Sequence, residues 1–322
     1  MGLGMAALAG CATTPADVHQ QAVAGNDRAA DRVAQSLYST NPAVRQAAIA
    51  ELLKMNHLDA ATEDLLNATL SPDPAVRGDV GAALLFNPNS DLDFYAITLV
   101  ADKDAGVRKR MAEGLAAAGR AGPAEKTRAA GIYLWGLEQD ENPDVRAAAA
   151  QGLGEIGLVD PMDFALGALR EDPEPRVRAA AARGLGAPAQ AYLAGERGPD
   201  WGDAKVQEFL TNRLGQQPLT PVQARGEVIV LALCKTAQTD DGEYVEAQEV
   251  DTWFGRERVE TKRYVALEAA AALTVPGKPP RADVAAAQAA AQAAAQARGQ
   301  AQTPKSMEAP RVFIHPPRGP GS

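Results

Sequence analysis

Residues 142–157 read NPDVRAAAAQGLGEIG, and variants of this stretch recur through the middle of the chain. The arginines of successive copies lie 32, 31, 38 and 32 residues apart. A repeat of this period is the sequence signature of a solenoid, in which neighbouring repeats stack on one another. Aligned on the arginine, the other copies are NPAVRQAAIAELL at 41–53, DPAVRGDVGAALL at 73–85, DAGVRKRMAEGLA at 104–116 and EPRVRAAAARGLG at 174–186.

Each copy is predicted to be a turn followed by a helix. Asn or Asp before Pro is a signal for the start of a helix, and Pro suits the first helical turn. The apolar positions from Val145 to Ile156 recur with the three-and-four spacing of one helix face. The Ala and Gly residues between them let helices approach closely but bury little area, so one repeat alone cannot offset its ordering entropy. Stacking must therefore supply the core.

A bulkier helix is expected before each of these anchored helices. The predicted segments are 58–70, 92–101, 125–139, 161–170 and 204–214. Residues 27–38 are expected to form a first, capping helix. Residues 221–236 are strongly apolar, and part of this run fits a strand as well as a helix. We expect a helix there because its surroundings are helical.

This helix–turn–helix unit, with its D/N-P-x-V-R turn, resembles HEAT repeats over about residues 30–215. It is most similar to the short HEAT-like repeats first named from phycobilisome lyases. The resemblance implies an all-α fold, a right-handed α–α superhelix with flexible N- and C-terminal segments. It also implies that an Asp six residues before the repeat arginine pairs with arginines of the stack. Asp102, Asp140 and Asp172 match this pattern, whereas Ser39 and Ser71 depart from it, which predicts a weaker ladder at the N-terminal end. The arginines expected to be structural are Arg45, Arg77, Arg108, Arg146 and Arg178.

The composition and net charge of the chain exclude some classes of function. The chain has 322 residues, a net charge of −9 and only 5% aromatic residues. An acidic chain lacks the basic face that nucleic-acid binding requires, so we expect no nucleic-acid partner. The two cysteines, Cys11 and Cys234, cannot form a stabilising disulfide framework. We expect Cys234 to be a buried core thiol.

The first eleven residues, MGLGMAALAGC, resemble a bacterial lipoprotein signal that ends in a lipobox cysteine. No Lys or Arg precedes Cys11, which departs from the usual signal. The resemblance implies lipidation of Cys11, a flexible tether over 12–26 and a membrane partner reached through the lipid. Because Ala12 rather than Asp follows the cysteine, it also implies an outer-membrane lipoprotein that faces the periplasm of a bacterial cell.

The repeat array is predicted to span residues 27–275. Clear repeats occupy 41–186 and degenerate repeats 201–275. The segment TDDGEYVEAQEVD at 239–251 lacks the ligand spacing of a calcium loop, so we interpret it as a solvated acidic loop and helix start. Residues 256–275 are expected to form one last helix that caps the array.

Residues 276–322 are predicted to be a low-complexity tail. The Ala- and Gln-rich segment 282–302 shows no apolar face, so we expect a marginal helix or a flexible spacer. Residues 310–322 hold one apolar knot, VFI at 312–314, between prolines. This knot fits either a docking motif that pairs as a strand or a disordered end.

No catalytic motif or metal-ligand spacing is found in the sequence, so we expect no enzyme activity, no metal and no cofactor. The favoured function is an envelope-anchored scaffold that binds another protein. The alternatives are a cytoplasmic, phycobilisome-lyase-like enzyme or chaperone-type helper, and a support for envelope structure. The helix positions expected to face a protein partner are Gln46, Lys109, Glu113, Gln151 and Arg183.

Overall fold

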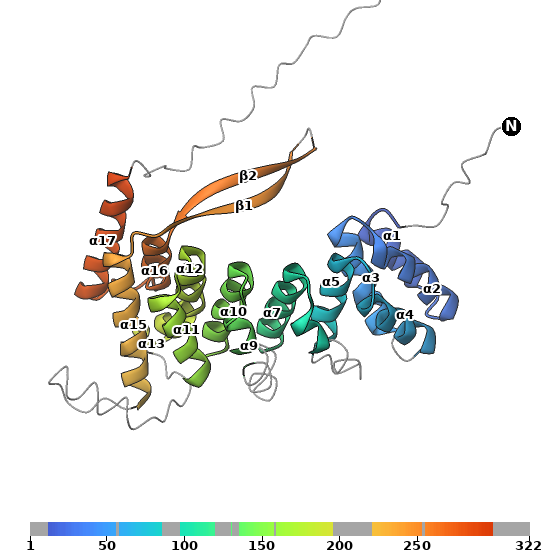
Figure 1. Cartoon of the computed structure of the whole chain (residues 1–322), viewed down its shortest axis with the longest axis horizontal. Helices are drawn as coiled ribbons and strands as arrows, with labels where there is room; N and C mark the ends of the chain where they lie inside the picture. The colour runs from blue at the N-terminus through green and yellow to red at the C-terminus, as the bar shows by residue number, and fades with distance from the viewer. Residues whose placement is uncertain are drawn as a thin grey trace, which may run out of the picture.

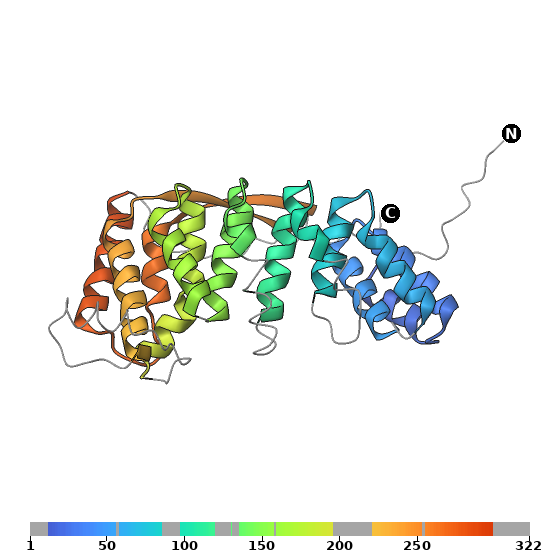
Figure 2. The same cartoon turned by 60° about the horizontal axis from the view of Figure 1, so that its bottom comes forward.

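The computed structural model describes residues 12–55, 58–85, 97–119, 130, 135–157, 159–195, 221–252 and 255–298. Helices stand side by side in one elongated array, and two strands extend along it (Figures 1 and 2). The helices are α1 (Pro15–Ala22), α2 (Asp27–Ala34), η1 (Gln35–Tyr38), α3 (Pro42–Lys54), α4 (Asp59–Thr69), α5 (Pro74–Leu84), η2 (Leu99–Ala101), α7 (Ala105–Gly119), α9 (Trp135–Glu138), α10 (Pro143–Ile156), α11 (Val159–Glu171), α12 (Pro175–Gly184), α13 (Gly186–Leu193), α15 (Pro221–Thr239), α16 (Val265–Ala272) and α17 (Ala282–Ala297). The strands are β1 (Glu243–Thr252) and β2 (Gly255–Tyr264).

The anchored helices begin at the turns that the sequence predicted as their starts. The side chains of Asn41, Asp73 and Asn142 each accept a hydrogen bond from the backbone N–H two residues later. This satisfies one of the donors that every helix start leaves without an intrahelical partner. The following Pro lies in the first turn of α3, α5 and α10, where its missing N–H costs nothing.

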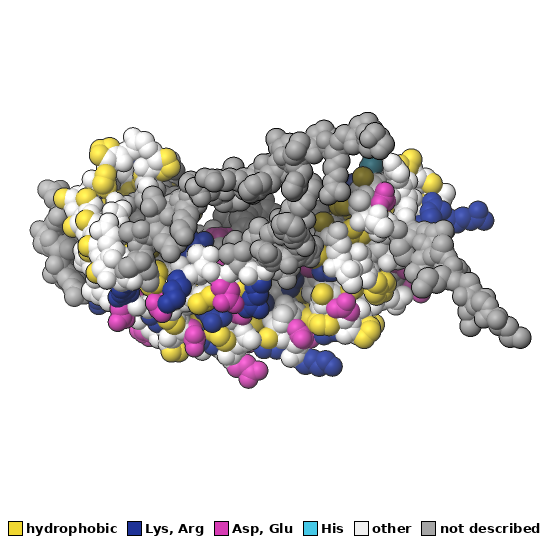
Figure 3. All heavy atoms as spheres, turned by 90° about the horizontal axis from the view of Figure 1, so that it is seen from above, with side chains coloured by type: hydrophobic (Ala, Val, Ile, Leu, Met, Phe, Trp, Pro, Cys, Tyr) yellow, Lys and Arg dark blue, Asp and Glu magenta, His cyan; other side chains and the backbone are white. Residues whose placement is uncertain are grey.

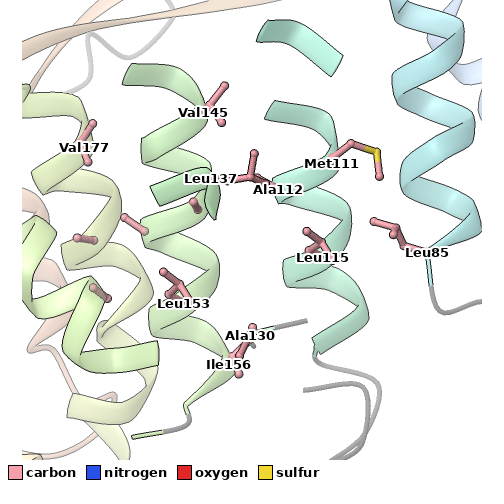
Figure 4. Packing of buried hydrophobic residues seen from close by; sticks show 14 of the residues in the cluster. Leu85, Met111, Ala112, Leu115, Ala130, Leu137, Val145, Leu153, Ile156 and Val177 are labelled. Atoms are coloured by element: carbon pink, nitrogen blue, oxygen red, sulfur yellow. The ribbon is translucent and has the colours of Figure 1, made fainter. Parts of the chain in front are cut away.

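The hydrophobic core is formed by the helix faces that lie between adjacent helices of the array. Val145 and Leu153 of α10 are fully buried, as are their counterparts Val44 and Leu52 of α3. Figure 4 shows Leu115 and Leu153 directed into the layer between the helices. The array therefore has one continuous core that grows by stacking, and the predicted all-α, HEAT-like solenoid is confirmed.

Glycines at the ends of α10 and α12 allow these helices to approach closely. A Cβ on Gly154 would lie 2.6 Å from the backbone carbon of Gly184, and a Cβ on Gly184 would clash with the Gln151 backbone. Gly154 and Gly184 are thus required by the close packing of α10 and α12.

The preceding helices are confirmed where the structure describes them. α4 and α11 match the predictions at 58–70 and 161–170, α2 with η1 matches 27–38, and α15 confirms a helix over 221–236. Within the described parts of 92–101 and 125–139 lie η2 and α9. The segment predicted at 204–214 lies outside the described residues.

The flexible tether predicted at 12–26 is wrong in part, because α1 forms there and packs against α2 and α3. Thr14 accepts a hydrogen bond from the Asp17 backbone, and the Asp17 side chain accepts one from the Thr14 backbone. This capping box begins the helix, and Val18 is fully buried. A short polar segment is therefore ordered by its cap and by one apolar side chain.

The last helix predicted at 256–275 is also wrong in part. Its first half is β2, which pairs antiparallel with β1, and only residues 265–272 form the helix α16. The strands contain Tyr, Val and Thr, which favour a pleated conformation. The expectation of one last repeat helix missed the strand because β2 is fixed by its pairing with β1, in a hairpin that extends away from α16 (Figure 1).

The Ala- and Gln-rich segment forms the ordered helix α17, contrary to the expectation of a marginal helix or flexible spacer. It packs against α15 and α16 through a buried face of one valine and three alanines. The predicted boundary at 276 therefore precedes a helix of the packed body. The residues of this face are Val284, Ala287, Ala291 and Ala295.

Candidate functional site: a polar groove beneath the hairpin

A ladder of arginine–aspartate pairs connects successive repeats. Arg108 donates to both carboxylate oxygens of Asp140 at 2.6 and 2.9 Å. Arg77 does the same to Asp102 at 2.9 and 2.9 Å. Arg146 binds Asp172 in the same two-pronged way, at 2.9 and 3.1 Å. Such paired contacts fix the planar guanidinium in one orientation, so each bridge sets the spacing of two repeats.

Each ladder arginine also closes its own turn. Arg108 donates to the backbone oxygen of Asp102, six residues earlier. The hydrogen bond from Arg77 lowers the pKa of the Asp102 carboxyl below its ordinary value. Burial opposes ionisation of Asp140, but the hydrogen bonds from Arg108 and the Asn142 backbone lower its pKa. These carboxylates are therefore stabilised as anions.

The N-terminal end departs from this pattern, as Ser39 and Ser71 predicted, but another carboxylate replaces the missing one. Arg45 binds Asp79 on α5, with its Nε 2.9 Å from Oδ2. The Nε of Arg110 lies 2.8 Å from the other oxygen of Asp79. Asp79 is buried and joins three helices, and no sequence motif pointed to it.

The ladder continues into the acidic segment predicted to be a solvated loop. Arg178 donates to Asp240 at 2.7 and 2.9 Å, although 62 residues separate them. The Gly242 backbone N–H donates to Asp240 as the Asp104 backbone N–H does to Asp102. The interpretation of Asp240 as a solvated residue was wrong, because this residue is the last carboxylate of the ladder.

The hairpin is an insertion between this last ladder turn and its helix. The Val265 backbone N–H, at the start of α16, donates to the Gly242 backbone oxygen at 3.1 Å. The chain thus leaves and rejoins the array at one point. In Figure 1 the two strands extend from there over α12 and α10 towards α7.

A groove of about 800 Å³ lies between the hairpin and the helices α7, α10 and α12. Its floor is polar and interrupted by alanines, and its roof is formed by both strands. The lining residues are Lys109, Glu113, Ala116, Asp144, Ala147, Ala148, Gln151, Gly152, Glu155, Arg176, Ala180, Arg183, Tyr244, Val245, Glu246, Ala247, Arg258 and Glu260.

The groove brings together most of the positions predicted to face a partner. Lys109, Glu113, Gln151 and Arg183 all line it. Gln46 is exposed on α3 and does not line it. The roof residues from β1 and β2 were not predicted, because only the hairpin brings them over the helices.

Arg183 connects the floor to the roof. Its Nη1 donates to the Tyr244 hydroxyl at 2.9 Å, and its Nε donates to the Gln151 side-chain oxygen at 3.4 Å. The Tyr244 hydroxyl also donates to Glu268 on α16 at 3.2 Å. Burial raises the pKa of Tyr244, so it stays a neutral donor at physiological pH. These contacts hold the base of the hairpin against α12.

Charges of both signs line the groove. Arg176 pairs with Asp144 at 2.9 Å, and Lys109 lies 3.9 Å from Glu113. Figure 3, seen from the hairpin side, shows Lys and Arg side chains interspersed with Asp and Glu over the middle of the molecule. Such a surface suits a polar polypeptide better than a polyanion such as nucleic acid.

Other candidate groups fall outside the groove. Cys11, the predicted lipidation site, and the apolar knot at 312–314 lie outside the described residues. Cys234 is buried, and burial raises its pKa to about 11, which makes it a poor nucleophile. Within the described ranges no helix is long and apolar enough to cross a membrane, and no cluster of His, Cys, Asp and Glu could hold a metal.

A comparison with protein families agrees with the repeat architecture. A family model described as HEAT repeats matches residues 93–186 and 132–227. A crystal structure titled as an engineered protein is 20% identical, with a TM-score of 0.32, and the match covers 53% of this chain and 88% of that one. A second engineered protein is also 20% identical, with a TM-score of 0.37 and coverage of 88% and 68%. No curated protein matches the chain. The family match shows HEAT repeats over residues 93–227, and the ladder has the regular spacing of such repeats. HEAT repeats commonly mediate protein interactions through their extended surfaces.

Proposed function

We propose that this HEAT-repeat chain is a non-enzymatic scaffold that binds a partner protein in the groove beneath its hairpin. The observation that carries the proposal is the meeting of Lys109, Glu113, Gln151 and Arg183 with two strands around one groove. Solenoids expose long surfaces of this kind, and binding there needs no catalytic group.

We also propose that a lipid on Cys11 anchors the scaffold to the periplasmic side of a bacterial outer membrane. The lipobox-like sequence that ends at Cys11 supports this proposal. Intact mass after expression in the native host tests it, beside Cys11→Ser. Loss of the residues before Cys11 with added acyl mass is expected, and only when the cysteine is present. An unprocessed soluble chain would contradict the anchor and favour the cytoplasmic, lyase-like alternative.

Site-specific photo-crosslinking in cells tests the groove itself. A benzoylphenylalanine at Lys109, which is exposed in the groove, should give one discrete protein adduct. The matched control is the same group at Gln292, exposed on α17 at the far end of the array. No adduct from 109, or the same adducts from both positions, would contradict the proposed site.

A further inference from the structure

The hairpin presents an unpaired strand edge to the groove. Val265 donates a backbone hydrogen bond to Gly242, which lies opposite it, so these two residues form a hydrogen-bonded pair. Along an antiparallel ladder, hydrogen-bonded pairs alternate with pairs that are not hydrogen-bonded. The backbone groups of Tyr244 and Glu246 therefore hydrogen-bond to β2. Val245 and Ala247 direct their backbone N–H and C=O groups away from β2, to the outer edge of β1. All four residues line the groove. Among the residues that the structure describes, no main-chain group bonds this edge.

β1 is long enough to run past the three helices that form the floor of the groove. β1 contains 10 residues, which at about 3.3 Å each span roughly 33 Å. Neighbouring helices pack about 10 Å apart, so this length crosses about three of them. The lining residues do come from three successive anchored helices, α7, α10 and α12. An added strand would run along β1 at about 4.8 Å from it, with the helices as its floor.

Charge indicates the chemistry of that segment. β1 (EYVEAQEVDT) contains four acidic residues and no basic one, whereas β2 (GRERVETKRY) contains four basic and two acidic residues. Glu246 pairs with Arg263 at 3.0 Å, and Glu243 lies 3.5 Å from Lys262. Opposite charges across strands stabilise the pairing. The acidic strand therefore has a basic strand on one side only.

We propose that the groove takes an extended, basic polypeptide segment that adds to the outer edge of β1 as a third strand. This rests on the proposed function and names the chemistry of its partner. Main-chain hydrogen bonds from Val245 and Ala247 give the affinity of strand addition, and the net charge of −9 attracts a basic segment. A second copy that added its β1 here would place acids opposite acids, which is unfavourable.

The probe is the fluorescein-labelled peptide GRERVETKRY, because its sequence already pairs with β1. Its binding to the full chain is measured by fluorescence anisotropy. A peptide with every Arg and Lys changed to Glu should bind at least tenfold more weakly. A peptide N-methylated at alternate residues keeps its charge but loses donors, and it should also bind at least tenfold more weakly to the unaltered protein.

The protein variants are Val245→Pro and Lys262→Pro. These residues are opposite each other in the register, and each directs its N–H away from the hairpin, so either proline keeps the internal ladder. Val245→Pro removes a donor from the edge at the groove and should weaken binding at least tenfold. Lys262→Pro alters the other edge and should leave binding within twofold. Melting curves establish that both variants fold.

Three results would overturn the inference. Equal binding of the N-methylated peptide would exclude strand addition, and equal binding of the acidic peptide would exclude the charge preference. A concentration-dependent dimer abolished by Val245→Pro would assign the edge to a second copy of the chain. A partner crosslinked at 109 whose capture is insensitive to Val245→Pro would retain the proposed function and refute the strand addition alone.

Discussion

The regular repeats over 41–186 and the C-terminal region over 221–298 are built on the same ladder but on different sequences. In the first region Arg77, Arg108 and Arg146 each meet an aspartate 25 to 32 residues later. Arg45 meets Asp79 34 residues later. In the second, Arg178 reaches Asp240 across 62 residues, and a hairpin separates the ladder turn from α16. The bidentate contact between Arg178 and Asp240 therefore keeps the repeat geometry where the consensus sequence is lost.

The largest expected effect is on the core of the regular region. Leu153→Asp places an unpaired charge in a fully buried position, so the free energy of unfolding should fall by more than about 4 kcal/mol. Leu70→Asp is the matched control, because this leucine is 75% exposed. Thermal and urea unfolding measure both. Equal melting of the two variants would refute the helix register.

The ladder can be compared directly between the two regions. Asp140→Ala and Asp240→Ala each remove one partner of a largely buried pair, and each should cost about 3 kcal/mol of unfolding free energy. Asp241→Ala, at an exposed neighbouring position, is the control and should stay within about 0.5 kcal/mol. A negligible effect at Asp240 alone would mean that the ladder ends before the C-terminal region.

Substitutions on α17 test whether this helix is a packed cap of the array or a flexible spacer. Ala291→Glu buries a carboxylate at a position 1% exposed and should lower the unfolding free energy by about 2 kcal/mol. Ala293→Glu introduces the same side chain on the exposed face of the same helix and should have little effect. If chemical unfolding does not distinguish the two, α17 is not part of the packed body.

The smallest effect concerns two carboxyls that lie two residues apart. Burial raises the pKa of Glu138. Burial also acts on Asp140, but the hydrogen bonds from Arg108 and the Asn142 backbone, with the nearby arginine charges, together outweigh it and lower the pKa of Asp140. Ionised Glu138 therefore opposes folding at neutral pH, and Glu138→Gln should add about 0.5 kcal/mol at pH 7. That gain should vanish below the unfolded pKa of 4.5.

Asp140→Asn should show the opposite sign. The depressed pKa contributes stability above the unfolded value of 3.8, and this stability is lost as pH falls through the lower folded pKa. The variant should therefore be less stable at pH 7 and converge with the parent in acid. Urea midpoints measured from pH 7 to pH 3 check both signs. Parallel profiles for the two variants would contradict the assigned shifts.

The sequence by itself determined the repeats, because their signals are local. A proline after Asn or Asp begins three of the five anchored helices. The arginine six residues after Asp102, Asp140 or Asp172 is a fixed offset within one repeat turn. The same regularity placed four polar positions on one face, and these positions line the groove. The predictions for Cys11 and the membrane concern chemistry outside the described residues and stay predictions.

The partners of the first and last ladder arginines, the packing of α17 and the position of the hairpin were decided only by the tertiary structure. These features depend on contacts between residues that are distant in the sequence. Asp240 resembles any exposed acid until Arg178 is brought to it, and Asp79 replaces a missing partner from another helix. The alanine face of α17 has no strong apolar signal and is buried only because α15 and α16 offer it a surface. The position of the hairpin over α12 and α10 is set by Arg183, Tyr244 and the closing bond at Gly242.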